Sequence, residues 1–235
     1  MPTKRYRLLV FDWDGTLMDS VGHIVASMHA AMADLNVPRL PEAQVQDVIG
    51  LGLREALDTL FPDRDGEFKD RFTARYRAHF VTPGRVPPLF PDAELVLEAL
   101  DAAGYLLAVA TGKSRQGLLR ELHGTGLERR FHASRCAEET CSKPDPRMLL
   151  EIMAELGVDP GATLMIGDTE YDMAMARNAG AHGLGITHGV HSAERLLRHG
   201  PTGCIDALSQ FPKWLAQAGS VADTGARSGP AQRGG

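Results

Sequence analysis

Residues 8–16 read Leu8-Leu9-Val10-Phe11-Asp12-Trp13-Asp14-Gly15-Thr16, four apolar residues followed at once by an aspartate. A continuous apolar run of this length is typical of a strand that is buried on both faces, as in a parallel sheet. Three similar runs follow later in the chain, at 105–110, 163–166 and 182–186. The sequence therefore predicts at least four strands of one parallel sheet.

Helical patterns precede the three later runs, and each pattern stops at a glycine. They span residues 92–103, 147–156 and 171–179, and the next residues are Gly104, Gly157 and Gly180. Glycine is common just past the C-terminus of a helix. Strands that alternate with helices predict an α/β fold with a doubly wound parallel sheet.

The alternation is interrupted after the first strand by a segment that is helical throughout. We expect helices at 21–35, 42–49, 54–61 and 65–80, separated by Pro38, Gly50, Gly52 and Pro62. The predicted domains are an α/β catalytic core (1–18 and 84–218), a helical cap (19–83) and a disordered tail (219–235) rich in Gly, Ala, Ser and Arg.

Charge and composition argue against several functions. The net charge of −5 argues against nucleic-acid binding, which requires clustered Lys and Arg. Because no apolar stretch has the length of a membrane span or a signal sequence, we expect a cytoplasmic protein with no membrane partner. Cys136, Cys141 and Cys204 are expected to be buried free thiols, since an odd, low count gives no disulfide framework. His182, His188 and His191 match no zinc-binding spacing and are expected to be ordinary loop residues.

Asp12 and Asp14 are the first candidates for chemistry. Two aspartates directly after a buried strand are costly to desolvate without a metal or another partner. Half of a calcium-binding EF-hand loop is excluded, because Thr16 stands where a third acidic or amide residue is needed and the distal glutamate is missing. Asp19 and Ser20 are instead suited to capping the next helix.

Three further motifs fall at or near the carboxyl ends of predicted strands, the edge at which open α/β sheets bind ligands. Thr111-Gly112-Lys113-Ser114 resembles the end of a nucleotide-binding P-loop, but Leu107 stands where that motif needs a glycine. What remains is a hydroxyl and backbone N–H groups at a strand-to-helix turn, which favour an anion. Lys143 lies in a predicted loop, and Asp168 and Asp172 lie at the end of a strand that opens a helix.

Together the four stretches resemble the haloacid dehalogenase-like (HAD) hydrolase superfamily, whose pattern is Asp-x-Asp-Gly-Thr, then Thr or Ser, then Lys, then Gly-Asp with a further Asp. The phosphoglycolate phosphatase-like branch, which has a helical cap, is the more similar one. Asn178-Ala179-Gly180 and Asp19-Ser20 support that resemblance. Two points bear on it: Gly112 replaces a frequent asparagine, and Asp14, which true dehalogenases lack, implies phosphoryl transfer.

The resemblance implies a Rossmann-like HAD core and a phosphatase that acts on small phosphomonoesters, either phosphoglycolate-like or sugar phosphates. It implies that Asp12 is the nucleophile and that Asp14 is first a general acid and then a general base. Mg²⁺ is the implied cofactor, and the cap is expected to set specificity. Arg54 in the cap either binds a substrate carboxylate or is a solvated arginine on a helix face. The other implied site residues are Thr111, Gly112 and Lys143 for phosphate, and Asp12, Asp14 (through its backbone carbonyl), Asp168 and Asp172 for the metal. Asp172 is implied either as an additional ligand or as a partner of the other ligands.

Other functions remain open on the sequence alone. A phosphomutase, a pyrophosphatase and a nucleotide phosphatase use the same core on different substrates. A non-catalytic regulator that binds a phosphate ligand is disfavoured, because Asp12, Asp14, Lys143 and Asp168 are all present. The expected partner is a small phosphorylated metabolite, and the sequence does not predict an oligomeric state.

Overall fold

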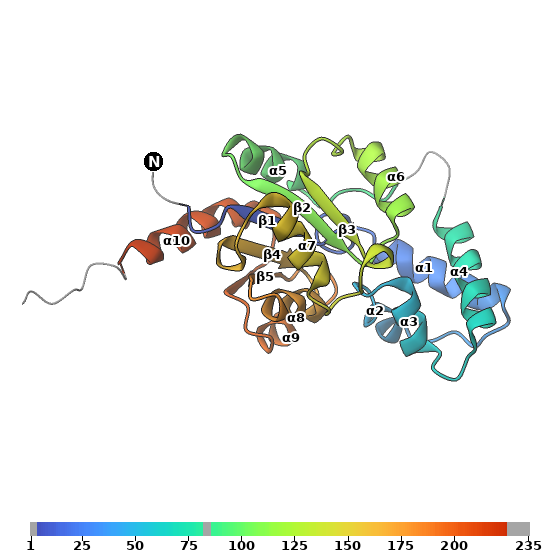
Figure 1. Ribbon diagram of the computed structural model, residues 1–235. Coiled ribbons are helices and arrows are strands. Elements are labelled where there is room, and N and C mark those ends of the chain that lie inside the picture. The colour runs from blue at the N-terminus through green and yellow to red at the C-terminus, as the bar shows by residue number, and fades with distance from the viewer. Residues whose placement is uncertain (1–3, 82–85, 225–235) are drawn as a thin grey trace, which may run out of the picture.

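The computed structural model describes residues 4–81 and 86–224, with side chains up to residue 218. Figure 1 shows two parts, an α/β core and a helical cap that projects from one edge of it. Within these described residues, no helix combines the length and apolar character needed to cross a bilayer.

The core contains a six-stranded parallel sheet in the order β3-β2-β1-β4-β5-β6. The doubly wound α/β prediction is confirmed, and the first strand lies at the centre of the sheet. The edge strands β3 and β6 were not predicted. The strands are β1 (Leu8–Phe11), β2 (Leu106–Thr111), β3 (Ala133–Cys136), β4 (Thr163–Gly167), β5 (His182–Ile186) and β6 (Gly203–Ile205).

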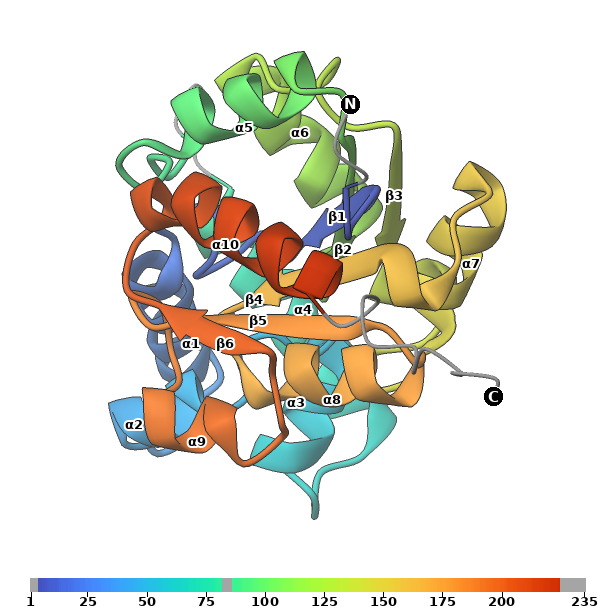
Figure 2. The ribbon, with the colours of Figure 1, turned by 90° about the vertical axis from the view of Figure 1, so that its left-hand side faces the viewer.

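Helices cover both faces of this sheet, as Figure 2 shows. Leu9 and Phe11 of β1 pack on one face, under α5, α6 and α10. Leu8 and Val10 pack on the other face, under α7 and α8. This alternation explains why β1 is apolar at every position, since each fully buried side chain of this kind contributes about 1.5–3 kcal/mol. The core helices are α5 (Ala93–Ala102), α6 (Arg115–Thr125), α7 (Arg147–Leu156), α8 (Glu170–Asn178), α9 (Ala193–Leu197) and α10 (Phe211–Thr224).

The cap consists of four helices with an apolar core of their own. Met28, Val45, Leu57 and Phe72 are among its buried side chains. The predicted cap helices are all present, with boundaries that differ from the prediction by at most three residues. They are α1 (Val21–Asp34), α2 (Glu42–Gln46), α3 (Leu53–Leu60) and α4 (Gly66–Phe80).

The two segments that connect cap and core lie side by side. Met18 on the outgoing segment forms an antiparallel bridge with Leu89 on the returning one. The backbone N–H of Asp19 donates to the carbonyl of Pro88 at 2.9 Å, and the N–H of Phe90 donates to the carbonyl of Leu17 at 2.9 Å. The cap is therefore attached to the core through one paired connection that begins within the Asp12–Asp19 loop.

Two sequence predictions need correction here. The disordered tail predicted from residue 219 is wrong for residues 219–224, which continue α10, because the dense Gly, Ser and Pro content starts only after Thr224. Residues 225–235 lie outside the described residues. The three cysteines are free, but only Cys136 is buried, while Cys141 and Cys204 are half-buried. The predicted helix stops are confirmed, since Gly104, Gly157 and Gly180 all adopt positive φ angles.

Candidate active site

Adjacent strands bring the predicted residues together at the carboxyl edge of the sheet. Asp12 follows β1, Thr111 ends the neighbouring β2, and Asp168 follows the other neighbour, β4. The N–H of Asp12 donates to the carbonyl of Ile166 at 2.9 Å, so pairing with β4 continues to the site. Neighbouring parallel strands thus gather residues that are more than 150 positions apart in sequence.

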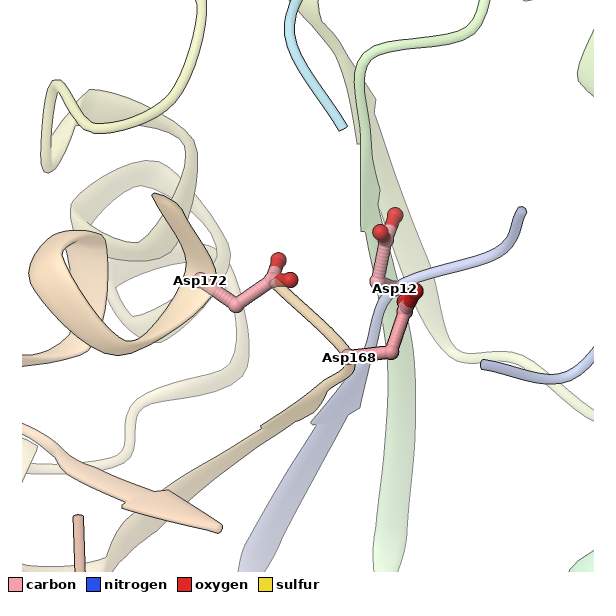
Figure 3. A group of neighbouring side chains, drawn as sticks. All are labelled: Asp12, Asp168 and Asp172. Carbon is pink, nitrogen blue, oxygen red and sulfur yellow. The ribbon is translucent and has the colours of Figure 1, made fainter. Parts of the chain in front are cut away.

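Three buried aspartates form a cluster at this edge. One carboxylate oxygen each from Asp12, Asp168 and Asp172 lies within 4.8 Å of the other two. Figure 3 shows Asp12 and Asp168 beyond the ends of their strands, with Asp172 extending from α8 toward them. Buried carboxylates this close together repel one another strongly unless cations lie among them.

Lys143 supplies one positive charge to the cluster. Its Nζ lies 2.7 Å from Asp12 Oδ1 and 2.6 Å from Asp172 Oδ1, and all three side chains are at most 1% exposed. Burial alone lowers the pKa of Lys143, but the two facing carboxylates outweigh it and the pKa is raised. Lys143 is therefore a buried ammonium that bridges the first and last aspartates of the cluster.

One lysine does not balance three carboxylates. Burial raises the pKa of Asp12 well above its usual range despite the neighbouring Lys143. Burial, followed by the charge of Asp172, raises the pKa of Asp168 to about 7. Asp12 Oδ2 is buried without a hydrogen-bond partner among the described residues. Hard oxygen ligands with excess negative charge and an unsatisfied oxygen fit a divalent cation such as Mg²⁺.

Asp168 and Asp172 are held in place by their neighbours. Asp168 accepts hydrogen bonds from Thr16 Oγ1 at 2.7 Å and from the N–H of Val190 at 2.9 Å. Asp172 Oδ2 accepts from the N–H of Thr169 at 3.1 Å and from its hydroxyl at 2.7 Å, which closes a capping box at the start of α8. Asp172 thus caps its helix with one oxygen and directs the other at Lys143.

The carboxylate of Asp14 lies apart from this cluster and makes contacts of its own. Ser20 Oγ donates to Asp14 Oδ1 at 2.6 Å, and Lys113 Nζ lies 2.9 and 3.0 Å from the two oxygens. Ser20 occupies the N-cap position of α1 as predicted, but its side chain makes no capping bond because the hydroxyl serves Asp14 instead.

Sequence reasoning assigned no role to Lys113, which is central to the contacts of Asp14. Its Nζ also lies 3.2 Å from Glu121 Oε1, and Glu121 Oε2 accepts from the indole N–H of Trp13 at 2.7 Å. Burial opposes a charged Lys113, but Asp14 and Glu121 outweigh it and raise the pKa. The available signal was the position of Lys113 directly after Thr111-Gly112 at a strand end. Its partner Glu121 is a fully buried glutamate that periodicity alone does not reveal.

Core and cap together line a cavity of about 610 Å³ at the site. Asp12, Asp14, Thr111 and Gly112 line it from the core, whereas Lys143 is not part of the lining. Arg54 lines it from the cap, with its side chain 54% exposed and bonded to Asp70 at 2.9 Å.

The three histidines of 182–191 do not come together as a metal site. His182 packs edge-on against Tyr6, and His188 Nε2 lies 3.1 Å from the carbonyl of Thr16. His191 Nδ1 accepts from the N–H of Glu170 at 3.0 Å. None of them belongs to the carboxylate cluster found among the described residues.

The family of the chain follows from its comparison with known proteins. The family model for haloacid dehalogenase-like hydrolases matches residues 9–186, which include the site from Asp12 to Asp172. The chain belongs to this family. The HAD-like resemblance of the sequence is therefore confirmed.

Relatives share sequence with this HAD-like chain, and solved structures share its fold. A probable phosphatase IndB from Dickeya dadantii is 34% identical over 86% of this chain and 90% of its own. A phosphoglycolate phosphatase from Agrobacterium fabrum is 32% identical over 77% of this chain and 81% of its own. The crystal structure of a predicted phosphoglycolate phosphatase from Haemophilus somnus superimposes with a TM-score of 0.80 at 25% identity, and covers 90% of this chain and 99% of its own.

Proposed function

We propose that this chain is a Mg²⁺-dependent phosphatase that hydrolyses small phosphomonoesters through an aspartyl-phosphate on Asp12. The observation that carries the proposal is the cluster of Asp12, Asp168 and Asp172, in which Lys143 bridges Asp12 and Asp172, next to a cavity that Asp12 itself lines. The names of the relatives support phosphatase chemistry.

Asp12 is the nucleophile of the proposed first step. Its carboxylate attacks phosphorus and forms an acyl phosphate, while the bond from phosphorus to the alcohol oxygen breaks. Lys143, which holds Asp12 Oδ1 at 2.7 Å, orients the carboxylate and offsets part of its charge. A buried nucleophile that is fixed in this way needs little reorganisation at the moment of attack.

Asp14 carries the protons in both steps. It first protonates the leaving alcohol oxygen, and it then accepts a proton from the water that attacks phosphorus and releases Asp12 and phosphate. Ser20 and Lys113 hold the Asp14 carboxylate in the cavity wall, where a leaving group has access to it.

The remaining residues bind the metal and the phosphoryl group. Asp12, Asp168, Asp172 and the backbone carbonyl of Asp14 would hold Mg²⁺, which when bound offsets the charge on the phosphoryl oxygens. Thr111 and Gly112 are proposed to position those oxygens near the start of α6, where the backbone N–H groups favour an anion. Lys143 is proposed to contact them from its place beside Asp12.

Phosphate release in the presence of Mg²⁺ tests the proposal. The panel contains phosphoglycolate, sugar phosphates, simple alkyl phosphates, a nucleotide and pyrophosphate. We expect release from monoesters by the unmodified protein and a loss of at least about a thousandfold in Asp12→Asn, as for other catalytic nucleophiles. Asp63→Asn, an exposed cap aspartate, is the matched control and should retain full activity. Equal turnover by Asp12→Asn and the unmodified protein would remove Asp12 as nucleophile.

The same panel separates the rival functions. A pyrophosphatase or nucleotide phosphatase would release phosphate chiefly from those two compounds. A phosphomutase would isomerise a sugar phosphate, depend on a bisphosphate primer and release little phosphate. A regulator without catalysis would bind phosphate compounds and release none.

A further inference from the structure

The cap side of the active-site cavity is mainly apolar. Buried side chains from α1, from α2 and the turn after it, and from the end of α4 form its wall: Ile24, Met28, Val45, Val48, Ile49 and Phe80. A volume of about 610 Å³ lies in the range typical of larger ligands, which is about 300–1,000 Å³. The two-carbon acid of phosphoglycolate would leave most of this volume empty.

The positive charges around the cavity already have acidic partners. Four cationic side chains line it among the described residues, and each has a carboxylate within 4.0 Å. The described lining therefore presents no unpaired cation to a second carboxylate or phosphate on a substrate. The pairs are Arg54–Asp70, Arg77–Glu138, Lys113–Asp14 and Arg120–Glu121.

The two ion pairs nearest Asp14, Lys113–Asp14 and Arg120–Glu121, are the hardest to separate. Lys113 is 8% exposed and Glu121 is fully buried, so withdrawing Lys113 toward a substrate anion would leave Glu121 with less compensation. Breaking a buried ion pair in this way is costly, whereas an apolar group needs no such rearrangement.

An aromatic pair extends the apolar wall toward Asp14. Tyr76 lines the cavity and stacks on Phe80, with ring centroids 5.5 Å apart. Lys113 Nζ lies 4.6 Å from the centre of the Phe80 ring. A group attached to the phosphate ester at Asp14 would therefore meet aromatic and aliphatic surface.

The cap contacts the core beside the cavity through the turn at Gly50–Gly52. The N–H of Gly52 donates to Ser142 Oγ at 2.7 Å. A Cβ at Gly112 would lie 2.2 Å from the carbonyl oxygen of Leu51 and 2.8 Å from that of Gly50, so only glycine allows this approach.

We propose that the substrate carries an apolar group, and no second anionic group, on the alcohol side of its phosphate ester. The inference rests on the proposed phosphatase function and narrows its substrate class. Phosphoglycolate and bisphosphates are poor substrates on this view, because each presents a second anion to an apolar wall.

A series of primary alkyl phosphates tests the proposal without a change in the type of leaving group. The series is ethyl, butyl, benzyl and 3-phenylpropyl phosphate, with 2-phosphoglycolate as the anionic comparison. We expect kcat/KM to rise about tenfold from ethyl to butyl phosphate, since two more methylenes are buried, and to rise further for the phenyl esters. Phosphoglycolate should fall at least tenfold below butyl phosphate.

A cavity-filling variant tests whether the preference for apolar esters arises on the cap side of the cavity. Ala56 lines the cavity from α3 and is 4% exposed. Ala56→Leu should lower the ratio of kcat/KM for 3-phenylpropyl over ethyl phosphate at least fivefold. The matched control is Ala74→Leu, on the exposed surface of α4, which should leave that ratio unchanged. The series on the unmodified protein stands as a test even if Ala56→Leu fails to fold.

The possible results distinguish the inference from the function on which it rests. If no ester releases phosphate in an Asp12-dependent way, the proposed function fails. If release depends on Asp12 but kcat/KM is flat across the series, or is highest for phosphoglycolate, the function stands and the apolar-substrate inference is overturned.

Discussion

The core and cap sides of the cavity are built from opposite kinds of residue. The core lines it with largely buried charges in fixed contacts, such as Asp14 and Lys113, whereas the cap lines it with apolar helix faces and half-exposed charges such as Arg54. Buried charge is expensive and is retained where chemistry requires it, while an apolar wall costs nothing to bury. We propose from this contrast that reaction type is set in the core and substrate choice in the cap.

Two lysines, Lys143 in the core and Lys69 in the cap, show how the surroundings of a buried charge differ between the two parts. Lys143 lies between two fully buried carboxylates, at 2.7 and 2.6 Å. Lys69, in the cap, is almost as buried and lies 2.7 Å from Asp58, but that carboxylate is 53% exposed. The cap aspartate can be solvated if its lysine is lost, whereas the core aspartates cannot.

Removal of the metal should give the largest effect on turnover, because all of its proposed ligands lie in the core, where the reaction takes place. We expect a chelator to abolish turnover and added Mg²⁺ to restore it. Asp168→Asn should raise the Mg²⁺ concentration needed for half-maximal activity by at least tenfold. Because the pKa of Asp168 is raised to about 7, protons compete with the metal, and the required Mg²⁺ should increase as pH falls below 7. A chelated protein that retains its full rate would contradict the metal assignment.

Replacement of the two lysines should separate core from cap in stability. Lys143→Met should lower the free energy of unfolding of the metal-free protein by about 3–5 kcal/mol, since it strands Asp12 and Asp172 in the interior. Lys69→Met should cost about 1 kcal/mol or less, because the exposed Asp58 stays hydrated. Urea denaturation of both variants measures the two losses in the free energy of unfolding. Equal losses would contradict the claim that the core aspartates depend more on their lysine than Asp58 does.

Replacement of Arg54 should give the smallest effect. Arg54 was a sequence candidate for binding a substrate carboxylate, but it lies half-exposed at the cavity wall and is paired with Asp70. We expect Arg54→Gln to change kcat/KM less than twofold for alkyl phosphates and for phosphoglycolate alike. A selective loss of at least tenfold for phosphoglycolate would restore Arg54 as a carboxylate-binding residue.

The sequence predicted the sheet centre well because strands buried on both faces are apolar without interruption. β1 and β5 have the predicted bounds, and β2 and β4 differ by one residue. β3 reads Ala-Ser-Arg-Cys and β6 has only three residues, so neither edge strand carries the same signal. Edge strands are buried less completely, and their residues are therefore less constrained.

The candidate site was predicted to the extent that its residues sit at strand ends. Asp12, Thr111 and Asp168 each follow or finish an apolar run, and the order of strands in the sheet brings them together. Lys113 and Tyr76 were missed because their importance comes from tertiary contacts. Lys113 meets Asp14 across 99 positions, and Tyr76 faces the cavity only because α4 packs beside α1. Periodicity reports which face of a helix is buried, and it does not report what that face meets.

The paired connection at Met18 and Leu89 makes the cap a removable module. The chain leaves the core and returns to it at adjacent backbone positions, so a different insert could be joined there without disturbing the order of strands in the sheet. The carboxylate cluster lies on the core side of that junction and would be inherited intact by any such recombinant. New substrate ranges could thus arise by exchange of one continuous segment while the carboxylate cluster stays unchanged.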